Sequence, residues 1–190
     1  MIRQLIILFC SLMLVASCSQ KPDTNAVLDF YGKMQAAMLF YKDEQQNFIN
    51  KTTDAINDLQ YDRVVDTKTL RLLLDTAKMA MQSRRETVDT LKEIDEEIGY
   101  KQKMINYIDT FSSAYNHEFP DFITMLESDK PKGEKVVYLT EKLKSKLLRI
   151  QECETEVKNA KEAMLSKYKL DGVDEMMDKV NEMRKENFQN

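Results

Sequence analysis

Apolar side chains recur at three- and four-residue steps through most of this chain, in four long seams. The seams cover residues 27–59, 70–94, 104–126 and 136–168. Such spacing places the apolar side chains on one face of an α-helix, and no stretch shows the sustained alternation that is typical of a half-buried β-strand. Only four Gly and three Pro interrupt the 190 residues. The sequence therefore predicts an all-α fold.

Turn and capping residues mark the ends of these helices. The candidate N-cap residues are Asp23 or Thr24 for the first helix and Asp66 or Thr67 for the second. Short polar side chains suit these positions because they accept hydrogen bonds from the free N–H groups of the first turn. The chain should reverse around Gly99 and again at residues 129–133. Pro120 should kink the third helix, because its ring displaces a backbone hydrogen bond.

Four seams of similar length joined by short connections predict an antiparallel up-and-down four-helix bundle. Helices of about 30 residues would form a rod roughly 45 Å long. Beyond Gly172, apolar residues within 173–183 predict a short fifth C-terminal helix. Its methionines could form an adaptable contact surface, but we expect this helix to fold back on the bundle. A single domain over residues 25–190 accounts for the pattern.

The first and third helices hold most of the aromatic side chains, whereas the second helix has none. In an up-and-down bundle these two helices lie diagonally across the core, so their rings can meet at its centre. We therefore expect five rings to be largely buried: Tyr41, Phe48, Phe111, Tyr115 and Phe122.

The sequence carries no sign of catalysis, and we predict a protein without enzymatic activity, cofactor or metal ion. His117 is the only histidine and has no second histidine or cysteine near it, so it lacks the ligand set of a zinc site. A surface position suits it better. Carboxylates cluster at residues 93–97 and again at residues 152–156. Both clusters are expected to be solvated, the first because it flanks a turn and the second because it lies on one helix face.

One feature of the expected core leaves a ligand site open. Four tyrosines could turn their hydroxyls toward a cavity inside the bundle: Tyr31, Tyr41, Tyr107 and Tyr115. Rings at helical spacing usually belong to a packed core, which is our preferred interpretation.

Arg84 falls on or beside the apolar seam of the second helix, and we expect its charged end to reach the surface along its methylene stem.

The N-terminus reads as a processing signal. Arg3 gives a positive start, residues 5–15 are almost wholly apolar, and Ala16 and Ser17 are small residues that precede Cys18. A membrane-spanning helix needs about 20 apolar residues, so this run is too short to cross a bilayer as written.

The order Val15-Ala16-Ser17-Cys18 resembles the lipobox of bacterial lipoproteins. The resemblance implies that the thiol of Cys18 is acylated with diacylglycerol, with palmitate as the expected fatty acid, and that the chain is cut before Cys18. Residues 1–17 would then be a lipoprotein signal peptide and residues 18–24 a lipidated anchor with a short linker. It also implies that membrane lipid is a partner through Cys18. Ser19 is compatible with sorting to the outer membrane of a Gram-negative bacterium.

The expected mature chain is mildly acidic and has one free thiol. Without Arg3, the 28 Lys and Arg fall to 27 against 32 Asp and Glu, which gives a formal charge of −5. This balance argues against nucleic acid as a partner, because phosphate binding needs a concentrated basic surface. With Cys10 removed and Cys18 acylated, only Cys153 stays free, so no intramolecular disulfide can form. Its place beside the fourth seam predicts partial burial.

A second, broader resemblance concerns the third helix. The pattern Tyr107-x3-Phe111-x3-Tyr115-x2-Glu118-Phe119-Pro120-x-Phe122 is similar to that of small all-helical surface lipoproteins of Gram-negative bacteria with uncharacterised function. It implies no catalytic residue. Two kinds of function stay open: a lipid-anchored interaction or structural module of the cell envelope that holds a protein partner, and, as the alternative, a small-ligand binding or sensing protein that uses the tyrosine-lined interior.

Overall fold

The computed structural model describes residues 22–39, 42–61, 63–128, 133–170, 172, 173, 175, 176 and 179. Throughout these residues the regular secondary structure is helical, as the apolar periodicity predicts. The helices are α2 (Thr24–Leu39), α3 (Lys42–Gln60), α4 (Thr67–Asp89), α5 (Tyr100–Asn116), α6 (Glu118–Leu126) and α7 (Gly133–Tyr168).

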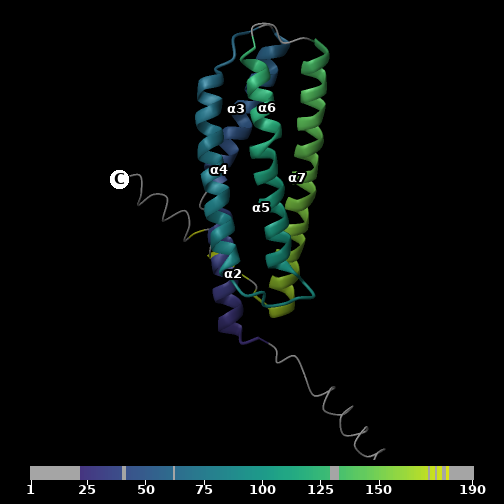
Figure 1. The fold of residues 1–190 in the computed structure, drawn as a ribbon. Coiled ribbons are helices and arrows are strands. Elements are labelled where there is room, and N and C mark those ends of the chain that lie inside the picture. The colour runs from purple at the N-terminus through teal and green to yellow at the C-terminus, as the bar shows by residue number, and fades with distance from the viewer. Residues whose placement is uncertain are drawn as a thin grey trace, which may run out of the picture.

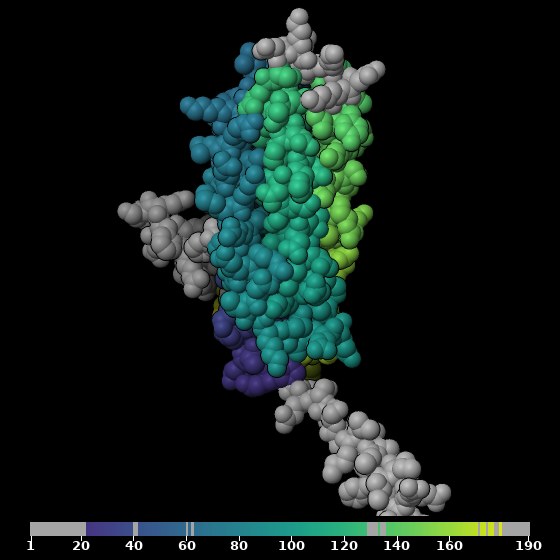
Figure 2. Space-filling model, viewed as in Figure 1, coloured from purple at the N-terminus to yellow at the C-terminus, as the bar shows by residue number. Residues whose placement is uncertain are grey.

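The helices form a bundle in which α3 packs beside α4, α4 beside α5, and α5 beside α7 (Figure 1). The start of α2, the connection over residues 90–99 and the end of α7 gather at one end. The connection over residues 61–66, α6 and the start of α7 gather at the other end (Figure 1). Side chains of α4, α5 and α7 close the gaps between the ribbons on the face that Figure 2 presents. None of the described helices is long and apolar enough to cross a membrane.

The structure describes the expected first helix over residues 27–59 as α2 and α3, and the two residues between them, 40 and 41, lie outside the described residues. Whether the helix is continuous there stays a prediction. The carbonyl oxygen of Met38, near the described end of α2, accepts a hydrogen bond from Nη2 of Arg84 at 3.1 Å. A side chain of α4 therefore holds this part of α2.

The second helix begins where predicted but ends earlier. Oδ1 of Asp66 accepts from the backbone N–H of Thr69 at 3.0 Å, which confirms Asp66 as an N-cap. The helix stops at Asp89, so Leu91 and Ile94, expected on its seam, lie in the connection over residues 90–99. Both side chains still pack against the core, which explains why apolar spacing alone extended the helix too far.

The kink predicted from Pro120 is confirmed as a break between α5 and α6 at His117. Pro120 is the third residue of α6, and a proline ring clashes with the carbonyl group four residues before it. The backbone of His117 leaves the helical region, with φ −126° and ψ −71°. The N–H of His117 still bonds to the carbonyl oxygen of Ser113 at 3.1 Å, so the break is tight.

Aromatic rings meet in the core as the sequence predicts. Phe48 of α3 packs edge-on against Tyr115 and Phe119, with ring centroids 5.3 and 4.7 Å apart. Phe111 and Phe122 are also buried. The fifth expected ring, Tyr41, lies outside the described residues. T-shaped ring pairs add about 0.5–1.5 kcal/mol each beyond the burial of their surface.

The expected fifth helix over residues 173–183 lies mostly outside the described residues, and it stays a prediction. Leu170 is buried, and Val173 packs against the core. Lys169 and Gly172 have φ values of +54° and +80°, so the chain turns sharply after α7. Glycine at position 172 adopts such a value without a steric penalty.

Candidate functional site

The first candidate residue, Cys18, lies outside the described residues, and so does the whole expected signal peptide. The described chain starts at Pro22, and α2 begins at Thr24. The carbonyl oxygen of Asp23 accepts from the N–H of Val27 at 3.0 Å, which closes the first turn. Only the five residues from Ser19 to Asp23 therefore separate Cys18 from a helix of the bundle.

The structure places the candidate tyrosines in packed core rather than around a cavity. Tyr31, Tyr107 and Tyr115 are buried, and Tyr41 is outside the described residues. Tyr107 and Tyr115 each pack against Phe111, with ring centroids 5.2 and 5.3 Å apart. Neither of the two surface hollows characterised below is lined by any of these tyrosines.

A buried polar cluster joins one of these tyrosines to Arg84. Nη1 of Arg84 donates to Oε1 of Gln45 at 2.7 Å, and Nε2 of Gln45 donates to the hydroxyl of Tyr107 at 3.0 Å. Arg84 is only 2% exposed. The expectation that Arg84 reaches the surface is therefore wrong. Hydrogen bonds to Gln45 and to the carbonyl oxygen of Met38 hold Nη1 and Nη2 of the guanidinium inside the bundle, and such bonds lower the cost of a buried charge.

The hydroxyl group of Tyr115 differs from that of Tyr107. It is buried and makes no hydrogen bond within the described part of the chain. Burial raises the pKa of Tyr115 far above its ordinary value, because the phenolate would lose its hydration. The Tyr115 hydroxyl therefore stays neutral and has no role as an acid or base near neutral pH.

The acidic residues at 93–97 are not uniformly solvated as predicted. Glu96 and Glu97 are exposed, but Asp95 is only 6% exposed. Oδ2 of Asp95 accepts from Nζ of Lys167 at 2.6 Å and from the hydroxyl of Tyr168 at 2.9 Å. Asp95 therefore fastens the connection between α4 and α5 to the end of α7.

Two opposing effects act on the pKa of Asp95. Burial raises it, whereas hydrogen bonds from Lys167, Tyr168 and the backbone N–H of Ile98 lower it. The hydrogen bonds outweigh burial, so the pKa lies below its ordinary value and the side chain is a carboxylate near neutral pH. Its role is structural, because its oxygens are already occupied by donors of the protein.

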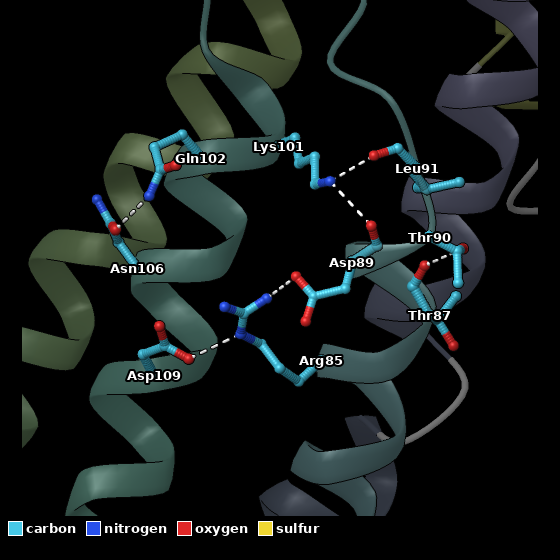
Figure 3. A network of polar contacts seen from close by, with 9 residues as sticks. All are labelled: Arg85, Thr87, Asp89, Thr90, Leu91, Lys101, Gln102, Asn106 and Asp109. Carbon is cyan, nitrogen blue, oxygen red and sulfur yellow. Dashed lines mark hydrogen bonds and ion pairs between the residues drawn. The ribbon is translucent and has the colours of Figure 1, made fainter.

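Further polar contacts hold the same connection from its other side (Figure 3). Nζ of Lys101 donates to the carbonyl oxygens of Asp89 and Leu91, the first at 3.1 Å, and so satisfies the end of α4. Arg85 pairs with Asp89 on its own helix and, through Nε at 3.0 Å, with Asp109 of α5. These contacts join α4 to α5.

The remaining candidates have structural positions. Cys153 is buried, which confirms the prediction, and its Sγ lies 3.7 Å from Oγ1 of Thr110. His117 is exposed on the surface. Glu152 and Glu154 are exposed on α7, as expected for a solvated face. Within the described ranges, no group of three or more His, Cys, Asp or Glu side chains is placed to hold a metal ion.

Two hollows lie on the surface of the bundle. One, of about 420 Å³, runs along α7 from Tyr138 to Arg149 and reaches Glu118 at the start of α6. The other, of about 340 Å³, lies between α3 and α4 and is lined by Lys51, Asp58 and Arg63 among others. Sequence reasoning missed both, because each combines residues from separate helices. For the first hollow, the sequence offered one signal: Pro120 predicts a break in the third helix, and this break places Glu118 at a helix start.

Comparisons with known proteins give no relative for this chain: no protein-family model matches it, and searches of curated proteins and of solved structures found no match.

Proposed function

We propose that this chain is a lipid-anchored lipoprotein of the cell envelope and works as a non-enzymatic interaction or structural module. In this proposal it is an antiparallel up-and-down four-helix bundle with a short fifth C-terminal helix, and its outer surface holds an envelope protein. One observation carries the proposal: a positive start, an apolar run, Ala16, Ser17 and Cys18 follow one another at the spacing of a lipoprotein signal.

The described residues support a module that works through its surface. The tyrosines that could have lined an interior site are packed against other rings. Solvent-facing features are more numerous, since both hollows and eight large apolar side chains are open to solvent in the described part. The alternative, a small ligand held inside the bundle, therefore has less support than a partner held outside it.

The lipid anchor determines where such a module can work. A single acyl chain binds a membrane only marginally, whereas the two or three chains of a bacterial lipoprotein hold a protein firmly. A flexible linker of five residues has a root-mean-square reach of about 12 Å. The bundle would therefore stay close to the bilayer, in our proposal the outer membrane of a Gram-negative bacterium, and meet its partners there.

Replacing the acylated residue tests the proposal. Cys18→Ala should block acylation and signal removal, because no thiol is left to carry the lipid, and a longer precursor should accumulate. Cys10→Ala is the matched control: it also removes a cysteine from the N-terminal region but leaves the Val15-Ala16-Ser17-Cys18 order intact. Gel mobility and partition into detergent report the result. A Cys18→Ala protein that matures and partitions like the wild type would make the cysteine incidental.

A further inference from the structure

In the hollow along α7, the cationic side chains have partners within the chain, whereas the carboxylates are less well satisfied. Its wall on α7 runs over three turns from Tyr138 to Arg149, a length of roughly 16 Å at 1.5 Å per residue. Glu118 closes it from the start of α6, next to the break at His117. The break that Pro120 imposes on the third seam thus brings a carboxylate to the edge of α7.

The three cations that line this hollow already have partners. Nζ of Lys146 donates to Oγ of Ser113 at 3.0 Å, and Nζ of Lys142 lies 3.8 Å from Asp121. Nη1 of Arg149 donates to Glu152 at 2.8 Å. The partners Ser113, Asp121 and Glu152 are not among the residues that line the hollow. The cations are therefore only weakly available to an anionic ligand.

The two carboxylates of the hollow are less well satisfied. Glu118 has a side chain only 13% exposed, and its Oε2 is buried without a hydrogen bond in the described part of the chain. The nearest cation, Nζ of Lys146, is 4.0 Å away, beyond hydrogen-bond distance. Glu141 is exposed on the opposite rim and forms no ion pair or hydrogen bond with any described residue. Glu141 can accept directly from a donor outside the chain, and Glu118 has an acceptor oxygen without a donor in the described part.

Tyr138 adds an aromatic surface beside these acceptors. Its side chain is 64% exposed at the end of the hollow, one helical turn before Glu141. A ring face next to carboxylates attracts ammonium and guanidinium groups through cation–π and charge-assisted contacts. Together with Asp121 and Glu152, the hollow and its rim hold four carboxylates against three cations. This balance favours a positively charged ligand over a neutral or anionic one.

We propose that the hollow between Glu118 and Tyr138 binds the basic side chain of a partner protein. Glu118 and Glu141 accept hydrogen bonds from the ammonium or guanidinium group, and the ring of Tyr138 covers its apolar stem. The inference rests on the proposed function only in that a surface of this bundle holds a protein. The lipid anchor is tested separately through Cys18, so either proposal can fail while the other stands.

Arginine amide and citrulline amide distinguish a charge-reading site from a nonspecific hollow, because they have nearly the same shape and only the first is cationic. Each is added to the full chain, labelled with ¹⁵N, in non-ionic detergent at low salt, and backbone amide shifts are followed by NMR. We expect arginine amide to shift the amides of residues 118 and 138–149 with millimolar affinity. Citrulline amide and glutamate should leave these amides in place.

Charge-neutralising variants identify the groups that bind. Glu118→Gln should weaken binding on the order of tenfold, because it removes a charge-assisted acceptor in a shielded position. Glu141→Gln and Tyr138→Leu should each weaken it about threefold, as exposed contacts do. Glu154→Gln, at an exposed position of the same helix outside the lining and its ion pairs, is the matched control and should change nothing. Glu141 and Tyr138 are exposed, so their variants keep the test valid if Glu118→Gln alters the fold.

Four results would each overturn the proposal. Equal shifts with citrulline amide would show that charge is not recognised, and preferential shifts with glutamate would make the hollow an anion site. Unchanged affinity in both Glu118→Gln and Glu141→Gln would remove the proposed acceptors. A loss in Glu154→Gln as large as that in Glu118→Gln would show only a general electrostatic attraction.

Discussion

The two ends of the bundle are held in different ways. At the Asp95 end, formed by residues 90–99 with the start of α2 and the end of α7, side chains from α5 and α7 bond to the connection. At the Tyr61 end, formed by residues 61–66 with α6 and the start of α7, the contacts of the connection are local. Arg63, for example, pairs with Asp58 and lies over the ring of Tyr61.

Exposed apolar side chains follow the same division. Val64 is 96% exposed in the connection at the Tyr61 end. Five of the eight large apolar side chains that are open to solvent in the described part lie at or near this end: Tyr61, Val64, Leu72, Val137 and Tyr138. Contacts between distant residues hold the connection at the Asp95 end. At the Tyr61 end Arg71 of α4 pairs with Glu127 after α6, but the described polar contacts of the connection itself are local. Its exposed apolar side chains leave surface free, which is typical of an interaction site.

The anchor proposed at Cys18 would determine which end of the bundle faces the membrane. The described chain begins at the Asp95 end (Figure 1), and the linker before it is short. The fastened end would therefore lie next to the membrane, and the Tyr61 end would point away from it. The hollow with Tyr138 would then be open to envelope proteins rather than to lipid.

The largest effect should come from the core that both ends share. Phe111→Ala should lower the free energy of unfolding by about 3–5 kcal/mol, as the removal of a buried ring generally does. Phe111 packs between Tyr107 and Tyr115, so the cavity would open in the ring cluster itself. Urea unfolding followed by circular dichroism measures the loss. A loss below about 1 kcal/mol would show that the rings do not form a tight core.

Asp95→Ala and Asp66→Ala compare the two ends directly. Asp95→Ala should cost about 2–3 kcal/mol, because it removes the acceptor of Lys167, Tyr168 and the buried N–H of Ile98. Asp66 caps α4 with a local hydrogen bond at an exposed position, so Asp66→Ala should cost clearly less. The same unfolding measurement ranks the two variants. Equal losses would contradict the view that contacts between distant residues fasten the connection at the Asp95 end more strongly than local contacts fasten the one at the Tyr61 end.

Acid should weaken the Asp95 end in a predictable direction. The folded pKa of Asp95 is lowered, so its contribution to stability is present above the unfolded value of about 3.9 and is lost as the pH falls through the folded pKa. In Asp95→Asn this part of the acid dependence should disappear. Unfolding free energies of both proteins between about pH 5 and pH 2 provide the measurement. Parallel curves would mean that Asp95 is not charged and bonded as described.

The smallest effect should come from the exposed side chain at the Tyr61 end. Val64→Ser should change the unfolding free energy by less than about 0.5 kcal/mol, because the side chain makes little contact in the free protein. Thermal unfolding suffices for this comparison. A clear destabilisation would show that Val64 is part of the fold and not of a free surface.

The helices could be predicted because each one repeats a simple pattern. Apolar steps located every described helix, Asp66 marked the start of α4, and Pro120 marked the break before α6. The same method extended the second helix too far, because Leu91 and Ile94 are apolar but pack from a connection.

The polar positions were beyond the reach of periodicity. Arg84 was expected at the surface, yet its partners come from residues 38 and 45, which are distant in the sequence. The sequence does not distinguish Asp95 from a solvated acid in a turn, because its partners Lys167 and Tyr168 are distant in the sequence. A charged residue at a seam position is a usable signal of burial, but its partner depends on how the helices are arranged.

The mass of the mature protein tests the central claim most directly. The full chain is expressed in a Gram-negative host, extracted from the membrane with detergent and analysed intact and after proteolysis by mass spectrometry. Our account predicts an N-terminus at Cys18, the loss of residues 1–17 and an added mass that matches diacylglycerol with or without a third acyl chain. A chain that begins at Met1, is cut elsewhere, or carries an unmodified Cys18 would contradict the lipid anchor.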